Sequence, residues 1–253
     1  MMDFYAFLPS NASPEVYRDN KTSHFKIELS KRMELHGQWQ AALIELHYPN
    51  TKAQVLEGEN MITLLSEGSV DSVYIKAGCY PSKKDFLAAV STAVTVLNND
   101  IQNDTPLRER DDLRVEFTPF LPDREDVKVH FAPRLALQLG LDHPGPYPAN
   151  ESITGVKPVD LNLGIPPQLF VYMDILAAQI IGHTRAPILR TVPVDINARF
   201  GTMSIFHCEH PLYFDLNTRS FDTVQIDIRD HAGRYVPFDF GTSTLLVHFR
   251  QLS

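Results

Sequence analysis

Apolar and polar residues alternate along much of this chain, and this pattern predicts β-strands. The clearest examples are HFKIELS near the N-terminus and FDTVQIDIR, RYVPFDF and STLLVHFR near the C-terminus, with Gly233 suited to a tight turn. The side chains predicted to face the core are Phe25, Ile27 and Leu29, then Val224, Ile226 and Ile228, then Val236, Phe238 and Phe240, and finally Leu245, Val247 and Phe249.

Three stretches are apolar on both faces of their predicted strands: AALIEL, LFVYMDILAAQIIG and APILRTVPV. The first belongs to a strand with Trp39, Ala41 and Leu43 on one face and Ala42, Ile44 and Leu46 on the other. A two-layer sandwich buries only one face of each sheet. We therefore expect the remaining apolar surface to be covered by a helical insert or by neighbouring subunits, and for part of it we favour subunits.

The middle of the chain changes period. NMITLLS and DSVYIKAG predict two short strands with a turn at Glu67-Gly68, and LRVEFTPF with DVKVHFAP predicts a hairpin around Pro122-Asp123. Between these pairs, the spacing of Phe86, Val90, Ala93 and Leu97 predicts a helix within 81–100, with Ser82 as N-cap and Asp85 three residues later. PRLALQLGL predicts a short helix from Pro133 to Gly140.

Together these elements predict an all-β protein, a single jelly-roll β-sandwich with a small helix-plus-hairpin insertion. We expect one domain over 1–253, with sandwich strands in 20–79 and 165–253 and the inserted helix, hairpin and short helix in 80–145.

Charge and composition exclude several classes of function. The formal net charge is −8 with no run of Lys or Arg, so direct binding of nucleic acid is disfavoured. No apolar stretch approaches the length of a membrane span, and no signal peptide is visible, so we expect a reducing compartment, cytosolic or nuclear. Two cysteines, Cys79 and Cys208, cannot build a disulfide framework.

No motif for catalysis or for a cofactor is present, and we assign no catalytic, cofactor-binding or metal-binding residue. In FHCEH, His207 and Glu209 point to one side of a strand while Cys208 and His210 point to the other, which favours a buried thiol and surface histidines. A cupin-like metal site would need a ligand from a facing strand, for which His47 and His248 are the candidates. Asp227 and Arg229 are expected to form an exposed pair, and Cys79 to be a packing residue.

Four stretches resemble the minor capsid (penton) protein of Polinton/Maverick elements and the related adintoviruses. They are GQWQAALIELHYPN, FVYMDILAAQIIGHTRAPILRTVPV, FDTVQIDIRDHAGRYVPFDFGTSTLLVHFR and, in the insert, VHFAPRLALQLGL. Together they span most of the chain from about Ser23 to Arg250.

The resemblance implies a single jelly roll that forms homopentamers at the vertices of an icosahedral shell. It also implies a double jelly-roll major capsid protein as partner, a location in the virion, synthesis in the cytoplasm with assembly there or in the nucleus, and no enzymatic activity. The residues themselves leave two alternatives open: a glycan-binding β-sandwich using loop aromatics such as Tyr147 or Tyr235, and a cupin-like metalloenzyme. Particle mass, glycan binding and metal content distinguish the three.

Overall fold

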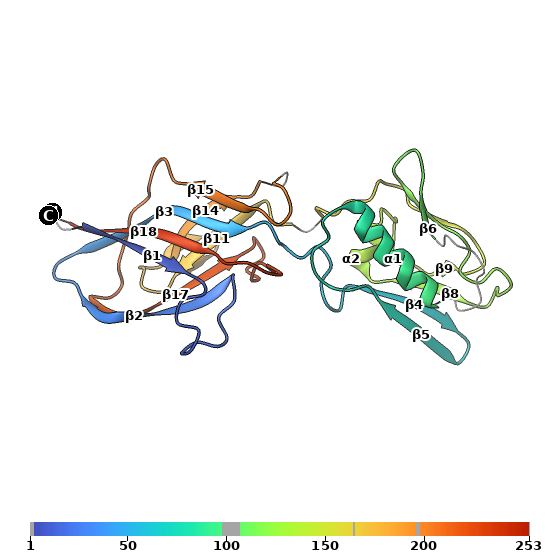
Figure 1. Ribbon diagram of the computed structural model, residues 1–253, viewed down its shortest axis with the longest axis horizontal. Coiled ribbons are helices and arrows are strands. Elements are labelled where there is room, and N and C mark those ends of the chain that lie inside the picture. Colours follow the sequence, from blue (N-terminus) through green and yellow to red (C-terminus); the bar gives the residue numbers. More distant parts are fainter. Residues whose placement is uncertain (1–2, 98–106, 164, 196–197, 253) are drawn as a thin grey trace. The chain divides into compact units, whose positions relative to one another are not determined.

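The computed structural model describes residues 3–97, 107–163, 165–195 and 198–252, and within them strands far outnumber helices. The chain divides into two compact units, drawn in Figure 1. The first, which we call the sandwich unit, combines Met1–Lys52 with Pro166–Ser253, and the second, the inserted unit, is Ala53–Ile165.

Eight strands of the sandwich unit form two antiparallel layers. The first layer has the order β1 (Asp3–Pro9), β18 (Thr244–Gln251), β3 (Trp39–Pro49) and β15 (Met203–His207), with the short β16 (Phe214–Asp215) also paired to β3. The second layer has the order β14 (Ile188–Pro193), β11 (Gln168–Met173), β17 (Ser220–Arg229) and β2 (His24–Glu34).

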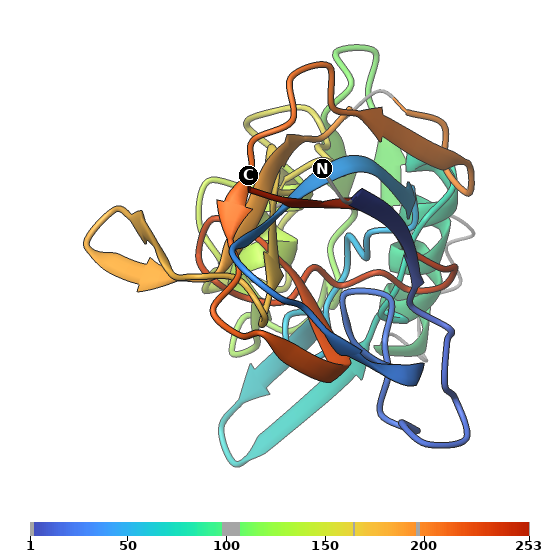
Figure 2. The same ribbon diagram turned by 90° about the vertical axis from the view of Figure 1, so that its left-hand side faces the viewer.

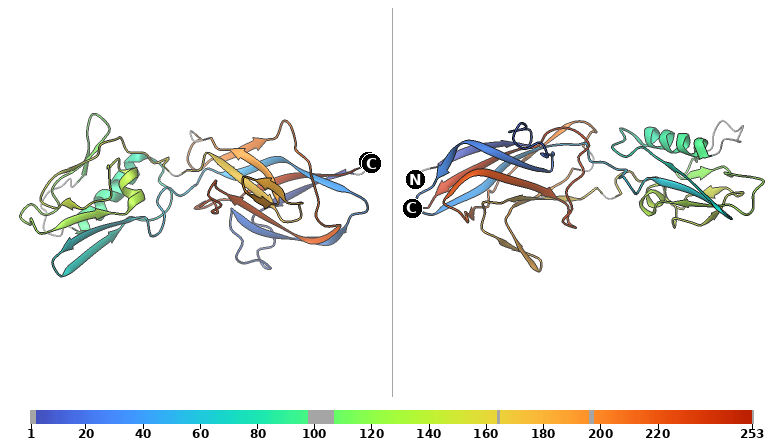
Figure 3. Two further views of the ribbon diagram at one scale, coloured as in Figure 1. Left: turned by 180° about the vertical axis from the view of Figure 1, so that it is seen from behind. Right: turned by 90° about the horizontal axis from the view of Figure 1, so that it is seen from below.

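This strand order defines the topology. Counted in chain order, the eight strands stand as 1-8-3-6 in the first layer and 5-4-7-2 in the second, which is the order of a jelly roll. The predicted all-β fold and single jelly roll are therefore confirmed. Because β1 and β18 are antiparallel, with Asp3 opposite Arg250, the two ends of the chain lie side by side (Figures 2 and 3).

The core between the layers follows the predicted alternation. Leu245, Val247 and Phe249 are buried, as are the inward residues of β17. The expected return strand RYVPFDF is wrong in part: this segment makes only isolated bridges, at Tyr235 and Phe238, and Phe240 is exposed. Pro237 lacks the N–H that a ladder needs, which is one physical reason.

A β-bulge in β3 explains much of the apolar pattern of AALIEL. Leu246 of β18 pairs with Glu45 while Val247 pairs with Leu43, so Ile44 is an extra residue. The alternation changes phase there, and Leu43 and Leu46 both enter the core. The second apolar face inferred from the sequence is therefore smaller than expected, because some of its residues turn inward after the bulge.

The inserted unit has its own core of buried residues, separate from that of the sandwich unit. Its elements are β4 (Met61–Ser66), β5 (Ser69–Tyr74), α1 (Lys83–Leu97), β6 (Leu107–Glu109), β7 (Val115–Phe117), β8 (Lys128–Phe131), α2 (Pro133–Gln138), β9 (Tyr147–Pro148) and β10 (Ile153–Thr154). One sheet has the order β5-β4-β8-β9 and the other β10-β7-β6. Neither helix described is long and apolar enough to cross a membrane.

The helix boundaries in this unit agree with the expectations. The Ser82 hydroxyl accepts a hydrogen bond from the Asp85 N–H at 3.2 Å, and Phe86 and Val90 are fully buried on the inner side of α1. At the end of α2, Gly140 has a φ of +75°, the left-handed conformation in which glycine is favoured.

Two expectations about the middle of the chain are corrected. The range 20–79 was expected to supply sandwich strands, but β4 pairs with β5 and with β8 in the inserted unit, and β1 lies outside the predicted range. The segments LRVEFTPF and DVKVHFAP do not form a hairpin, because β7 pairs with β6 and β10 whereas β8 pairs with β4 and β9. Alternation reveals which side chains of a strand are buried, but it does not reveal which strand lies alongside.

Candidate functional site

A buried carboxylate, Asp227, organises the outer face of the second layer. Asp227 is only 8% exposed to solvent. Oδ1 accepts hydrogen bonds from His24 Nδ1 at 2.7 Å and Gln225 Nε2 at 3.1 Å, and Oδ2 accepts one from Arg229 Nη2 at 2.5 Å. The Arg229 guanidinium also lies over the Tyr235 ring, 4.7 Å from its centre.

This arrangement corrects the expectation of an exposed Asp227–Arg229 pair: the pair forms, but its carboxylate is buried. Burial alone would raise the pKa of Asp227, yet the hydrogen bonds from His24, Arg229 and Gln225 outweigh it and hold the pKa below its usual value. The network ties β2 to β17 and to the turn that follows β17, so its role is structural.

Replacing Asp227 by alanine is expected to lower the free energy of unfolding of the sandwich unit by about 2–3 kcal/mol at pH 7, because charged hydrogen bonds are lost and Arg229 stays partly buried. The folded-state pKa is depressed, so the stabilisation is present above the unfolded pKa and disappears as pH falls through the folded pKa. The difference between wild type and variant should therefore shrink below about pH 4.

Urea unfolding followed by the fluorescence of Trp39, the single tryptophan of the chain, measures this difference. Asp222→Ala is the matched control, since Asp222 lies exposed on the same strand and carries the same charge. An Asp227→Ala variant as stable as Asp222→Ala at pH 7 would contradict the assigned role.

The histidines considered as metal ligands have other partners. His47 Nε2 lies 3.0 Å and His207 Nδ1 3.1 Å from the two carboxylate oxygens of Glu45, and the hydrogen bond from His47 lowers the pKa of that carboxyl. His248 Nδ1 lies 2.8 Å from the Tyr213 hydroxyl. Among the described residues, no group of three or more His, Cys, Asp or Glu could hold a metal ion.

The remaining residues of FHCEH lie as predicted. Cys208 is buried, with its Sγ 3.4 Å from the carbonyl oxygen of His210, whereas His207 and His210 are exposed. Cys79 is partly buried. The structure therefore supports the interpretation of a packed thiol flanked by surface histidines.

The two loop aromatics considered for glycan stacking are engaged with neighbouring side chains. The Tyr147 ring stacks on the His143 ring, with ring centres 4.5 Å apart and an angle of 9° between the ring planes. The Tyr147 hydroxyl donates a hydrogen bond to the His143 carbonyl. Tyr235 contacts His24 and Arg229 as part of the Asp227 network. A sugar ring would have to use whatever ring surface these contacts leave uncovered, so neither tyrosine is favoured as a binding platform.

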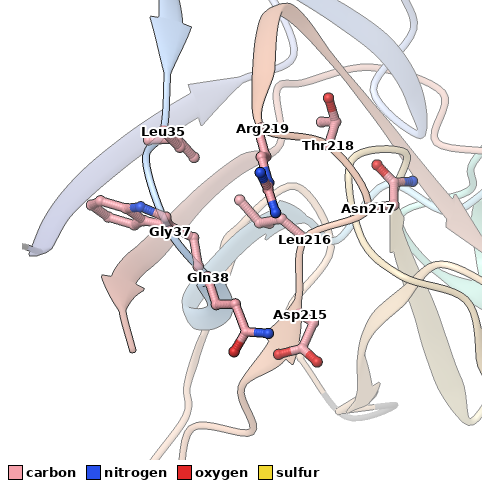
Figure 4. Close-up of a pocket in the computed structure, with 9 residues that line it drawn as sticks. Leu35, Gly37, Gln38, Asp215, Leu216, Asn217, Thr218 and Arg219 are labelled. Atoms are coloured by element: carbon pink, nitrogen blue, oxygen red, sulfur yellow. The ribbon is translucent and has the colours of Figure 1, made fainter. Parts of the chain in front are cut away.

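A pocket of about 250 Å³ opens between the loop after β2 and the segment after β16. Figure 4 shows the Arg219 guanidinium between the two segments, with Gln38 and Asp215 below it. The volume is under the ~300–1,000 Å³ typical of small-molecule sites. The pocket lies at the end of the sandwich where the two chain ends also lie, since the Leu252 N–H donates to the Gln38 carbonyl.

Large apolar side chains are exposed at both edges of the first layer, on β1 and on β15. On the outer face of the first layer, Tyr5 is 58% and Phe7 70% exposed on β1, and Met203 and Ile205 are about half exposed on β15. Between the layers the sandwich is already packed, so these side chains have no place inside it. Neighbouring exposed apolar side chains on an edge strand, such as Tyr5 and Phe7 on β1, are typical of a protein–protein interface.

Sequence reasoning missed part of this surface. The predicted sandwich strands begin at residue 20, although DFYAFLP has the alternation of a strand and forms β1 with Tyr5 and Phe7 on its outer side. That alternation was the available signal. The stretch LFVYMDILAAQIIG was expected to be apolar on both faces, but its end, AAQIIG, supplies the first strand of a separate hairpin instead.

No protein-family model matches the chain, and no curated protein matches it. Among solved structures, it is similar to the selenomethionine-labelled penton protein of mavirus, with a TM-score of 0.48 and 9% identity over the whole of both chains. It is also similar to a chain of the Sputnik virophage structure determined by cryo-electron microscopy, with a TM-score of 0.45, 10% identity and 98% of each chain covered.

Proposed function

We propose that this protein is a penton, a minor capsid protein that forms homopentamers at the vertices of an icosahedral particle of the Polinton/Maverick or adintovirus type. The observation that carries the proposal is where the resembling stretches lie. GQWQAALIELHYPN contains β3, FVYMDILAAQIIGHTRAPILRTVPV contains most of β11 and all of β14, and FDTVQIDIRDHAGRYVPFDFGTSTLLVHFR contains most of β17 and β18.

These strands are neighbours in the sandwich. β18 pairs with β3 in one layer, and β11 pairs with both β14 and β17 in the other. The family's signature stretches thus form the central framework of a single jelly roll. A signature that matched by chance would be expected to fall on unrelated elements.

The surface properties support an assembly role. A sandwich that buries its own core yet exposes Tyr5, Phe7 and Ile205 gains free energy when copies cover those side chains. The net charge of −8 suits a shell protein that leaves contact with the genome to other components. The proposed partners are four further copies and a double jelly-roll major capsid protein, and the proposed location is the virion, with synthesis in the cytoplasm and assembly there or in the nucleus.

Light scattering on the purified full-length chain tests the proposal. We expect a discrete particle of about five times the 28.6 kDa chain mass, whose population rises with protein concentration. A chain that stays monomeric at concentrations approaching millimolar would contradict the pentamer. Saturable glycan binding by such a monomer would favour a glycan-binding module instead.

A further inference from the structure

A small hairpin stands apart from both layers of the sandwich unit. Its strands, β12 (Gln179–Ile181) and β13 (Thr184–Ala186), pair only with each other, and Gly182 at the turn has a φ of +57°. The connection from β11 to β14 carries it, and both Figure 2 and the right view of Figure 3 show it projecting from the sandwich.

The root of this hairpin is fixed. The Asn217 side chain donates hydrogen bonds to the carbonyls of Asp174 and Leu176 at 2.9 and 3.0 Å, and the Ala177 N–H donates to the Asp215 carbonyl at 2.8 Å. The hairpin is therefore an arm on a rigid base.

The tip of the arm lacks a packing partner within its own chain. Ile180 is 73% exposed, the highest value among the large apolar side chains in the described part of the chain, and the turn residues are exposed as well. An isolated two-stranded hairpin is only marginally stable in water. A surface that covers Ile180 would stabilise it.

The outer face of β1 has matching properties. β1 is the edge strand of its layer, and its outer side chains Asp3, Tyr5 and Phe7 are all exposed. Tyr5 is held in place by stacking on His248, with ring centres 4.4 Å apart. The face therefore offers a fixed apolar surface with a carboxylate at one end.

The charges of the two surfaces are complementary. The stretch from Ile175 to Val194 contains no Asp or Glu, although the chain as a whole has a net charge of −8, and the arm itself carries His183 and Arg185. On the other side, Asp3 is the charged outer residue of β1, and the following loop is neutral overall because the exposed Glu15 and Asp19 are balanced by the exposed Arg18 and Lys21. Such a distribution favours contact between arm and β1 and disfavours contact between two arms.

The arm and β1 lie on opposite flanks of the sandwich. The arm precedes β14, which is the edge strand at one end of the second layer. β2 is the edge strand at the other end of that layer, and β1 is an edge strand of the first layer. Figure 2, viewed along the sandwich, shows the gold hairpin on one side and the dark blue N-terminal segment on the other. A contact between two such surfaces is head-to-tail, and it generates a ring when the rotation from one copy to the next closes.

We propose that the β12–β13 arm of one copy packs Ile180 against Tyr5 and Phe7 on β1 of the next copy, and so forms the contact that closes the ring. This inference rests on the homopentamer proposed above and identifies the two surfaces that build it.

Cross-linking between engineered thiols tests the contact. An Ile180→Cys chain and a Phe7→Cys chain are mixed under assembly conditions and treated with a short bis-maleimide. We expect cross-linked dimers from the mixture, ladders of up to five chains from the double variant, and neither product from a single variant alone. Val70→Cys replaces Ile180→Cys in the control, since Val70 has a similar exposure of 67% but lies on β5 of the inserted unit.

A charge at the tip provides the second measurement. Ile180→Asp is expected to raise the concentration at which half of the chains are assembled by at least about tenfold, because a charge would have to be buried. Val70→Asp should leave that concentration unchanged. The sandwich should stay folded in both variants, as Trp39 fluorescence reports.

The outcomes separate this inference from the proposed function. Pentamers that form without an arm-to-β1 cross-link, or that tolerate Ile180→Asp, would overturn the inference and leave the pentamer standing. An arm that contacted a different capsid protein would also give pentamers without this cross-link, and it would overturn the inference in the same way. Absence of pentamers in the unmodified protein would instead overturn the proposed function.

Discussion

Replacing Gly140 by alanine is expected to destabilise the inserted unit strongly while the stability of the sandwich unit stays unchanged. A Cβ at this position would lie 2.0 Å from the carbonyl oxygen of Lys157 and 2.8 Å from its carbonyl carbon. Both are backbone atoms, and the Lys157 N–H donates back to the Gly140 carbonyl, so the neighbouring segment cannot easily move away. Overpacking and the positive φ together should cost about 2–5 kcal/mol.

The two units can be followed separately in this experiment. Both helices that the structure describes lie in the inserted unit, so helical circular dichroism reports on that unit, whereas Trp39 fluorescence reports on the sandwich unit. We expect the helical signal of Gly140→Ala to be lost at a lower temperature or urea concentration than in the wild type, with the Trp39 transition unchanged.

Gly58→Ala is the matched control for Gly140→Ala. Gly58 also lies in the inserted unit and has a φ of +79°, but a Cβ there would meet no atom within 4 Å. Gly58→Ala should lower the free energy of unfolding only by the penalty of placing a Cβ at a positive φ, about 1–2 kcal/mol. If Gly140→Ala and Gly58→Ala lowered the stability of the inserted unit equally, close packing at Gly140 would be unimportant. If the helical signal and the Trp39 signal were lost together, the two units would not unfold independently.

The second large effect is expected in the other unit. Phe249 is 1% exposed on β18 and stacks on Phe4, with ring centres 4.8 Å apart, and on Phe221 at 6.3 Å. β18 lies between β1 and β3 in the first layer, so a cavity there weakens contacts with both strands. Phe249→Ala should lower the free energy of unfolding of the sandwich unit by about 3–5 kcal/mol.

The measurement for Phe249→Ala is the urea midpoint of the Trp39 transition, compared with that of Phe240→Ala. Phe240 is about half exposed in the segment before β18, and its removal should change the stability of the sandwich by less than about 1 kcal/mol. If the helical signal shifted as much as the Trp39 signal, the assignment of Phe249 to a core separate from that of the inserted unit would be wrong.

These variants also bear on assembly. A Phe249→Ala chain that still folds at low temperature should assemble less well, because β1 carries Tyr5 and Phe7 and depends on the packing of Phe4 against Phe249. Gly140→Ala leaves both proposed contact surfaces of the sandwich unit unchanged.

The alternation of the strands was sufficient to predict the fold class and the inward residues of β2, β17 and β18, because a strand with one buried face must place apolar side chains at every second position. The spacing of Phe86, Val90 and Ala93 and the cap at Ser82 predicted α1 for a similar local reason. Local chemistry also predicted that α2 stops before Gly140, which follows the C-cap residue Leu139.

Only the tertiary structure decided which strands are neighbours. β4 has the same alternation as the sandwich strands, yet it pairs with β8, and the bulge at Ile44 redirects Leu46 into the core. The burial of Asp227 among His24, Gln225 and Arg229, and the isolation of the hairpin that exposes Ile180, depend in the same way on residues far apart in the chain. Strand partners are set by long-range contacts, and the period of a single strand does not reveal which other strand lies alongside it.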